Sequence, residues 1–349
     1  MLDLGCGDGE LLAVFADHGA QALAGVDLSA QQLELARHRP SWPPPTRGSR
    51  GAAARRIRDR HRENPAADVT VRATVAGMTT PAEVFLRDYH DRKPEAASEL
   101  AVAGHIVGDD RTVYEVFADH VGVPVRVLDL GCGDGALLAV LAARGARTQA
   151  GIDLSPGHIR RALERPALAG ADLRAGRAQE LPFADGAFDA VVSFMALMLM
   201  VDVEKVVAEA ARVLAPGGTF ALGVGGPGEG ALEVFPKIAR PLFAVVPEDR
   251  RVPTAGDPRT RTRAGLDELL APAGFEPVAW HEVLIDVSGP PEQVWQTCCE
   301  TYYQMDSLDE TQLTGLRTAF KVATRDQVTA EGRLPAKARV HVAVTRLRS

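Results

Sequence analysis

Residues 127–135, VLDLGCGDG, lead an apolar run into three closely spaced glycines, and this turn constrains the fold more than any other stretch. Gly131, Gly133 and Gly135 stand where an apolar strand must turn into a helix with its backbone close to a ligand. Only residues without a side chain permit that approach. The segment therefore predicts a strand, a ligand-binding turn and a helix in direct succession.

Nearly the same segment, MLDLGCGDG, opens the chain. Residues 1–40 and 127–166, aligned without a gap, are identical at about 23 of 40 positions, so the chain contains an internal repeat. The first copy has two short predicted strands, a helix and part of another, and the pattern then stops. Because a unit of about 40 residues without a metal or disulfide is seldom stable alone, we expect residues 1–40 to be a partial duplicate that binds no cofactor independently.

Residues 41–77 are rich in proline, glycine and arginine and have no apolar period, which predicts a disordered basic linker. An arginine-rich arm for nucleic acid is the alternative, but no aromatic residue is interleaved for base stacking. We therefore expect a solvated linker followed by one main domain, residues 78–349.

The main domain alternates predicted strands with helices of about ten residues, which indicates a parallel sheet covered on both faces. The expected fold class is α/β, a Rossmann-like doubly wound, mostly parallel sheet with an antiparallel last strand. The expected strands are residues 125–130, 148–153, 172–175, 188–194, 219–223, 277–287 and 338–347. The expected helical regions are residues 81–120, 136–144, 158–165, 203–214, 262–273 and an insertion at 291–305.

The composition of the chain limits the classes of molecule that it is expected to bind. The 349 residues carry a net charge of −7 and a pI near 5.8, which argues against a general nucleic-acid binder and favours a small-molecule partner. The four cysteines fit no metal-ligand spacing, so we expect reduced thiols and no metal. No signal core or membrane-length apolar run is present, which predicts a cytoplasmic protein without membrane contact. A monomer or a homodimer is expected.

The spacing of the turn separates two classes of nucleotide-binding fold. Dinucleotide-binding folds use G-x-G-x-x-G, whereas here the third glycine comes one residue earlier and Asp129 lies two residues before Gly131. This arrangement resembles motif I of the class I S-adenosylmethionine-dependent methyltransferases. Two later stretches, AGRAQELPFADGAFDAVVSF and AARVLAPGGTFAL, resemble ordered motifs of the small-molecule methyltransferases called type 11. The resemblance spans roughly residues 80–349 and makes a nicotinamide dehydrogenase the less favoured alternative.

The resemblance implies that S-adenosylmethionine is the cofactor, and it assigns residues to the parts of that molecule. Asp153, followed by Leu154, ends a strand where a carboxylate can accept both ribose hydroxyl hydrogen bonds, and a helix N-cap is its alternative role. Asp129 is expected at the methionine end. Ala178 and Gln179 are expected at the adenine edge, although Gln179 could instead be a solvent-facing loop residue. Arg177 stands where the family usually has an acid.

Methyl transfer asks the protein mainly to align the reacting atoms and exclude water. An acceptor of high pKa would also need a base, and His281 is the expected catalytic residue, with Glu282 and His90 as the other candidates. The apolar run MALMLM at residues 195–200 suggests a lipophilic or aromatic acceptor, although core packing would also explain it. O-methylation of such a metabolite is the expected function. Carbon methylation, as in quinone-biosynthesis relatives, and non-catalytic cofactor binding are the alternatives.

Overall fold

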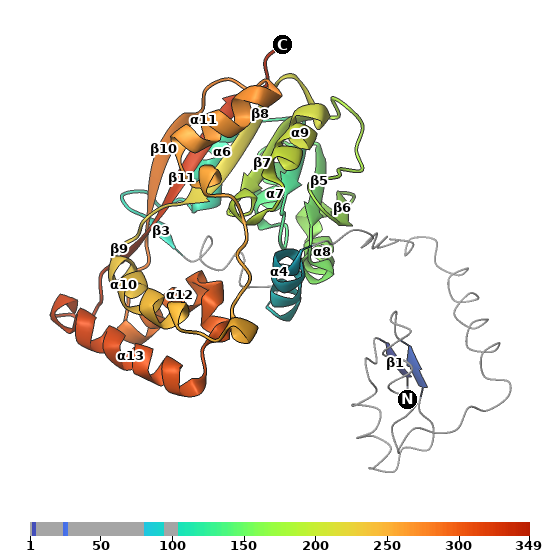
Figure 1. Cartoon of the computed structure of the whole chain (residues 1–349). Coiled ribbons are helices and arrows are strands. Elements are labelled where there is room, and N and C mark those ends of the chain that lie inside the picture. Colours follow the sequence, from blue (N-terminus) through green and yellow to red (C-terminus); the bar gives the residue numbers. More distant parts are fainter. Residues whose placement is uncertain (1, 5–23, 27–79, 94–103) are drawn as a thin grey trace. The chain divides into compact units, whose positions relative to one another are not determined.

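The computed structural model describes residues 2–4, 24–26, 80–93 and 104–349 (Figure 1). The chain divides into two units, Met1–Thr70 and Val71–Ser349. In the first unit, β1 (Leu2–Leu4) pairs in parallel with β2 (Ala24–Val26), with Leu2 opposite Ala24. The equivalent pair in the second unit has Leu128 opposite Ala150, so the two copies share one strand register. The predicted linker, residues 41–77, lies outside the described residues.

The second unit is built on one mixed sheet in the order β3-β10-β11-β8-β7-β4-β5-β6, with β9 paired to β11. Its strands are β3 (His105–Ile106), β4 (Arg126–Leu130), β5 (Thr148–Asp153), β6 (Asp172–Ala175), β7 (Phe188–Phe194), β8 (Leu214–Gly225), β9 (Glu229–Gly230), β10 (Ala279–Asp286) and β11 (Ala336–Arg346). Strands β4 to β8 pair in parallel, whereas β11 pairs antiparallel with both β8 and β10. The expected doubly wound sheet with an antiparallel last strand is confirmed.

The order of the parallel strands determines where the ligand crevice lies. The chain runs outward from β4 through β5 to β6, then returns to the other side of β4 for β7 and β8. This reversal leaves an open crevice at the carboxyl ends of β4 and β7, which is where open α/β sheets bind ligands. The glycine turn follows β4 directly, so the sequence motif and the topological switch coincide.

Helices cover both faces of the sheet because neighbouring strand residues point to opposite sides. Val127 packs with α6 (Val113–Val121), α7 (Ala136–Ala143) and α8 (Pro156–Leu163) on one face. Leu128 packs on the other face with α9 (Val203–Val213) and α11 (Arg263–Leu270). Two separate apolar cores therefore hold β4 in place.

A third layer of helices lies beyond one end of the sheet (Figure 1). It consists of α10 (Ala231–Ala244), α12 (Pro291–Thr301) and α13 (Glu310–Thr324), which share a core around Phe235, Trp295 and Phe320. Helix α4 (Pro81–Arg92) packs against α8 and lies beside it in Figure 1. None of the helices in the described ranges is long and apolar enough to cross a membrane.

Two of the differences from the expected elements concern residues 81–120 and 231–244. In the expected helical region 81–120, the described residues form the helices α4 and α6, and β3 between them pairs with β10. The segment 231–244, expected as part of a connection, is the helix α10 although it contains Pro236 and Pro241. Its buried residues Ala231, Phe235 and Ala239 recur at helical spacing, so packing on the third core outweighs the loss of two backbone donors.

Candidate functional site

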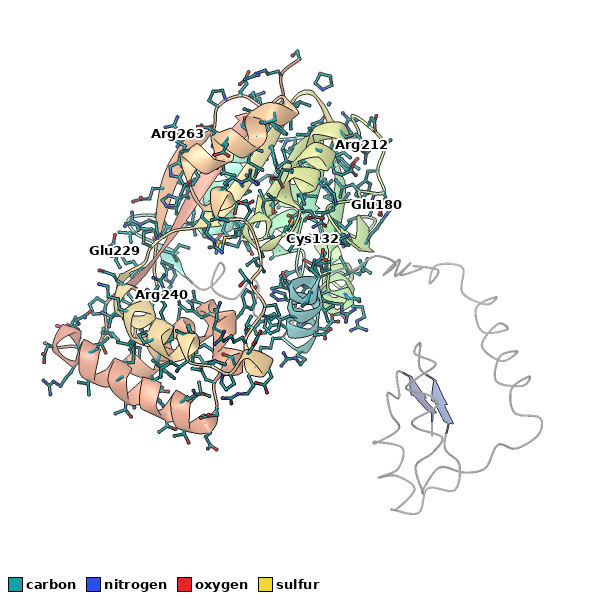
Figure 2. The ribbon with its side chains drawn as sticks, in the orientation of Figure 1. Cys132, Glu180, Arg212, Glu229, Arg240 and Arg263 are labelled. Atoms are coloured by element: carbon teal, nitrogen blue, oxygen red, sulfur yellow. The ribbon has the colours of Figure 1, made fainter. Side chains whose placement is uncertain are left out.

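The glycine turn is fixed by hydrogen bonds to the neighbouring strand and by close packing. The backbone N–H groups of Gly131 and Cys132 donate to the carbonyl of Ile152 at 2.8 and 3.1 Å. Gly131 has φ +73°, and a Cβ there would lie 2.4 Å from Cβ of Ala196. Figure 2 labels Cys132 in this turn, at the end of the sheet nearest α4. The position therefore requires glycine for conformation and for space.

Asp153, at the end of β5, is the acceptor at the centre of this turn. Its Oδ2 accepts from Gly133 N at 2.9 Å, and its Oδ1 accepts from Ser155 N at 2.9 Å and interacts with His158 Nδ1 at 3.1 Å. Burial alone would raise the pKa of Asp153, but the hydrogen bond and charge of His158, with the two backbone donors, lower it below 3.8. Asp153 is therefore an ionised carboxylate inside the crevice.

A cavity of about 80 Å³ lies between this turn and α4. Its lining comes from α4, from the ends of β4, β5 and β6, and from the segment after β7: Glu83, Leu86, His90, Gly131, Ile152, Asp153, Leu154, Gly176, Ala178, Gln179, Ala196, Leu199, Met200 and Val201. Small-molecule cavities usually measure about 300–1,000 Å³. Because α4 forms one wall, we expect it to move outward when a nucleoside-sized ligand enters.

Two histidines connect α4 to Asp153. His90 of α4 and His158 of α8 have ring centroids 4.8 Å apart, and His90 Nε2 lies 3.0 Å from the Tyr303 hydroxyl. Burial lowers the pKa of His158, but Asp153 outweighs this and leaves the pKa above 6.5. Burial and the neighbouring His158 lower the pKa of His90 to about 4. His90 is therefore neutral at physiological pH and His158 favours the charged form beside Asp153.

The segment after β7 forms the apolar wall of the cavity. Leu199 and Met200 line it, while Leu197 is buried in the core beneath. Met195 has φ +56°, a conformation that is unusual for a side chain of this size, and its N–H donates to Gly223 O at 2.8 Å. Such backbone strain is concentrated at ligand sites in proteins. The run MALMLM therefore contributes both core packing and part of the cavity wall.

Known protein families match both copies of the repeat. Residues 128–222, which contain the glycine turn, Asp153 and Gln179, match the methyltransferase domain of type 11. Residues 1–86 match a second methyltransferase-domain family. These matches identify class I S-adenosylmethionine-dependent methyltransferase domains in this chain. The cofactor of this family is S-adenosylmethionine, as the sequence predicted.

Individual methyltransferases are similar over part of the chain. A malonyl-[acyl-carrier protein] O-methyltransferase of Geobacter sulfurreducens is 34% identical over 174 residues, which is 48% of this chain and 62% of that protein. A fatty-acid O-methyltransferase of Mycolicibacterium smegmatis is 40% identical over 140 residues, 39% of this chain and 51% of that protein. The chain thus spans less than two thirds of these curated relatives.

A solved structure shares the fold of this methyltransferase at low sequence identity. The [4+2]-cyclase SpnF covers 78% of this chain and 99% of its own, with a TM-score of 0.50 and 20% identity. At that identity the similarity concerns the fold alone. Because that protein is described as a cyclase, the shared fold does not by itself determine the reaction.

The residues around the turn fit S-adenosylmethionine chemically. Asp129 is 2% exposed, and its Oδ1 is buried without a hydrogen-bond partner. Burial, and then the nearby Asp153, raise the pKa of Asp129 well above 3.8. An ammonium group such as that of the methionine portion would satisfy this oxygen and favour its ionised form. Asp153 offers the carboxylate that ribose hydroxyls require.

The predicted cofactor residues divide into two groups in the structure. Gly131, Asp153, Leu154, Ala178 and Gln179 line the cavity. Gln179 is half-buried rather than a solvent-facing loop residue, and its Nε2 donates to Val201 O at 2.7 Å.

Asp129, Gly133 and Gly135 are absent from the cavity lining. A Cβ at Gly135 would lie 2.6 Å from the Leu168 side chain, so this glycine allows α7 to pack closely against its neighbours. Gly133 acts through its backbone N–H, which donates to Asp153. These two glycines therefore shape the turn from behind the cavity.

His281, the expected catalytic residue, is not brought to the cavity. It is exposed on β10 and stacks on His120, with ring centroids 4.2 Å apart. Four strand spacings separate β10 from β4, which amounts to roughly 19 Å. Of the three bases considered, only His90 lines the cavity, whereas Glu282 is also on β10.

The aromatic residues of the insertion have two different roles. Trp295 and Tyr302 pack on Phe235 within the third core, at centroid distances of 5.8 and 5.4 Å. Tyr303 instead faces α4 and contacts Tyr89, with the two ring centroids 4.8 Å apart. The sequence could not separate these roles, because the three aromatic residues lie within nine residues of one predicted helical insertion.

Removal of residues 1–77 is expected to leave cofactor binding unchanged, because the described cavity is formed by residues 83–201. Calorimetric titration with S-adenosylhomocysteine should give one site per chain, and the same Kd, for the full chain and for residues 78–349. Two sites per full-length chain, or a large loss of binding after truncation, would mean that the first copy completes a pocket.

Proposed function

We propose that this methyltransferase methylates an oxygen atom of a small, largely apolar acceptor, and that this oxygen belongs to a carboxylate. The observation that carries the proposal is that His90, the candidate base that lines the cofactor cavity, has its pKa lowered to about 4 by burial and by His158. When bound, S-adenosylmethionine supplies an activated methyl group that passes to the acceptor oxygen as the carbon–sulfur bond breaks. The products are a methyl ester and S-adenosylhomocysteine.

The ionisable groups of the lining are Glu83, His90 and Asp153. Glu83 accepts a hydrogen bond from Arg177, and Asp153 has a lowered pKa and three donors of its own. His90, with a pKa of about 4, is a weak base. General bases are most effective with a pKa near the working pH. A carboxylic acid, with a pKa of about 4.3, is already ionised there and needs no base.

The named relatives support an oxygen nucleophile of this kind. Malonyl groups and fatty acids both present a carboxylate, and the two relatives named for them are O-methyltransferases. The matches extend over 174 and 140 residues of this chain. They do not extend over the full length of either relative, so the acceptor is part of the proposal.

A second cavity offers space for the acceptor. It measures about 370 Å³, within the usual range for ligand cavities, and lies between α4, α12 and α13. Its lining combines apolar and charged side chains: Tyr89, Lys93, Trp295, Gln296, Cys299, Glu300, Met305, Asp306, Glu310, Leu313, Thr314 and Arg317. Tyr303 contacts Tyr89 of this cavity and His90 of the cofactor cavity. Rearrangement of these aromatic side chains would join the two spaces.

The test is an acceptor panel with the full chain and S-adenosylmethionine between pH 6 and 9. A medium-chain fatty acid should be methylated at a rate that changes less than about threefold over this range, because the acid stays ionised. A matched alkylphenol, with a pKa near 10, should react at least about tenfold more slowly at pH 7. Mass spectrometry identifies the product, and mild alkali hydrolyses a methyl ester but not a C-methyl product.

Three other outcomes would contradict the proposal. A phenol methylated faster than the acid, at a rate rising with pH, would indicate a hydroxyl acceptor. An alkali-stable product formed from the fatty acid would indicate carbon methylation. Tight S-adenosylhomocysteine binding without turnover of any panel member would favour a non-catalytic binding protein.

A further inference from the structure

An ion pair links α4 to the loop after β6 at the edge of the cofactor cavity. Arg177 Nε and Nη2 both lie 2.7 Å from Glu83 Oε1, across 94 residues of sequence. The Glu83 side chain is only 3% exposed and that of Arg177 is 20% exposed. The hydroxyl of Thr80, the residue that caps α4, also interacts with Glu83 Oε2 at 3.1 Å. The Glu83 carboxylate is therefore held from two sides.

The pair stands at the part of the cavity assigned to adenine. Glu83 lines the same cavity as Gly176, Ala178 and Gln179, the residues on either side of Arg177 in sequence. Arg177 occupies the position where the resemblance places an acid. In this chain the acid reaches the same cavity from the N-terminal helix, and the arginine that replaced it in the loop holds that acid.

We propose that Glu83 binds the exocyclic amino group of adenine and that Arg177 is the positioning residue for its carboxylate. The proposal rests on S-adenosylmethionine being the ligand, as in the proposed function. An ionised carboxylate only accepts hydrogen bonds, and the amino group of adenine donates them. Arg177 Nε donates to Glu83 Oε1, so the guanidinium fixes the position of the carboxylate beside the cavity. Because Glu83 belongs to α4, this contact would connect α4 to the bound cofactor.

A stabilising role alone explains the pair less well. Buried ion pairs gain little net stability, because two charges must be removed from water. A pair that shapes a ligand site has a further effect, since it discriminates between ligands. The choice between adenine and a purine without the amino group is thus the property that separates recognition from stability.

Calorimetry with two ligands tests this directly on the full chain. S-adenosylhomocysteine carries the amino group, and S-inosylhomocysteine carries a carbonyl oxygen in its place. Glu83→Gln should weaken S-adenosylhomocysteine binding by about 10- to 100-fold, the usual value of a hydrogen bond to a charged group. It should leave S-inosylhomocysteine unchanged or bound more tightly, because a glutamine amide can donate to that oxygen.

Three further variants give the controls. Glu180→Gln removes an exposed carboxylate three residues beyond Arg177, labelled in Figure 2, and should change neither Kd. Arg177→Met should reduce the preference for the adenine ligand, and Arg177→Lys should restore part of it by keeping the charge. Thermal unfolding of each variant is measured alongside, so that a change in preference is compared with any change in stability.

The outcomes separate this inference from the proposed function. If the unaltered chain binds neither ligand, the proposed function and the inference both fail. If it binds S-adenosylhomocysteine but Glu83→Gln changes both affinities by the same factor, or neither by more than twofold, Glu83 is structural and only the inference fails. A change in the ratio of the two Kd values of at least about tenfold supports it.

Discussion

Asp153→Asn is expected to weaken S-adenosylhomocysteine binding by about 100-fold or more, while the chain still folds. Asparagine keeps the shape but loses the charge, and hydrogen bonds from two ribose hydroxyls to a carboxylate are each worth about 1.5–3 kcal/mol. Asparagine also has one acceptor oxygen in place of two, so it can accept fewer of the hydrogen bonds that Asp153 now makes with Gly133, Ser155 and His158. We therefore expect a loss of about 1–3 kcal/mol in the free energy of unfolding as well.

Asp172→Asn is the matched control for this variant. Asp172 is exposed at the start of β6 and pairs with Arg174 at 2.6 Å, so its replacement should change the Kd less than twofold. Calorimetry at a temperature where both variants are folded makes the comparison. The pKa of Asp153 lies below 3.8, so its contribution to binding is present above that pH and is lost only on further acidification. If Asp153→Asn bound S-adenosylhomocysteine with a Kd within threefold of that of the unaltered chain, Asp153 would not be part of the binding site.

The central site was predictable because its residues are local in sequence. Asp153 follows the glycine turn by a spacing that one strand, one helix and one more strand determine, and the repeat at residues 1–40 preserves it. The strands on either side pair in the same register in both copies. Short-range periodicity therefore sufficed to predict the sheet and the turn, and the resemblance proposed Asp153 as the ribose carboxylate.

The residues that the sequence misplaced or missed depend on long-range contacts. His281 has the chemistry of a base, but the strand order puts β10 four strands away from β4, and no local pattern reveals that order. Glu83 meets Arg177 across 94 residues, and the Thr80 to Glu83 spacing indicates only where α4 begins. His158 could have been noticed, because Ser155 caps α8 and places its third residue beside Asp153.

Gly131→Ala is expected to destabilise the fold by about 2–4 kcal/mol and to weaken S-adenosylhomocysteine binding at least about tenfold. Alanine at φ +73° costs about 1–2 kcal/mol. Its Cβ would also lie 2.4 Å from Cβ of Ala196, and such overpacking typically costs about 1–3 kcal/mol. Because Gly131 and Ala196 both line the cavity, the displacement that relieves the clash changes the binding surface. Urea unfolding and calorimetry measure the two effects.

Gly217→Ala isolates the conformational part of this cost. Gly217 has φ +74°, almost the same as Gly131, but a Cβ there meets nothing within 4 Å. The Gly217→Ala variant should lose only about 1–2 kcal/mol in the free energy of unfolding and should keep its affinity for S-adenosylhomocysteine. Combining Gly131→Ala with Ala196→Gly removes the clashing methyl group and should recover most of the binding. Equal losses for Gly131→Ala and Gly217→Ala, or no recovery in the double variant, would exclude the clash. Glycine at residue 131 would then be required by the approach of the ligand, as the sequence motif alone suggests. The packing of the segment after β7 against the turn would not be the reason.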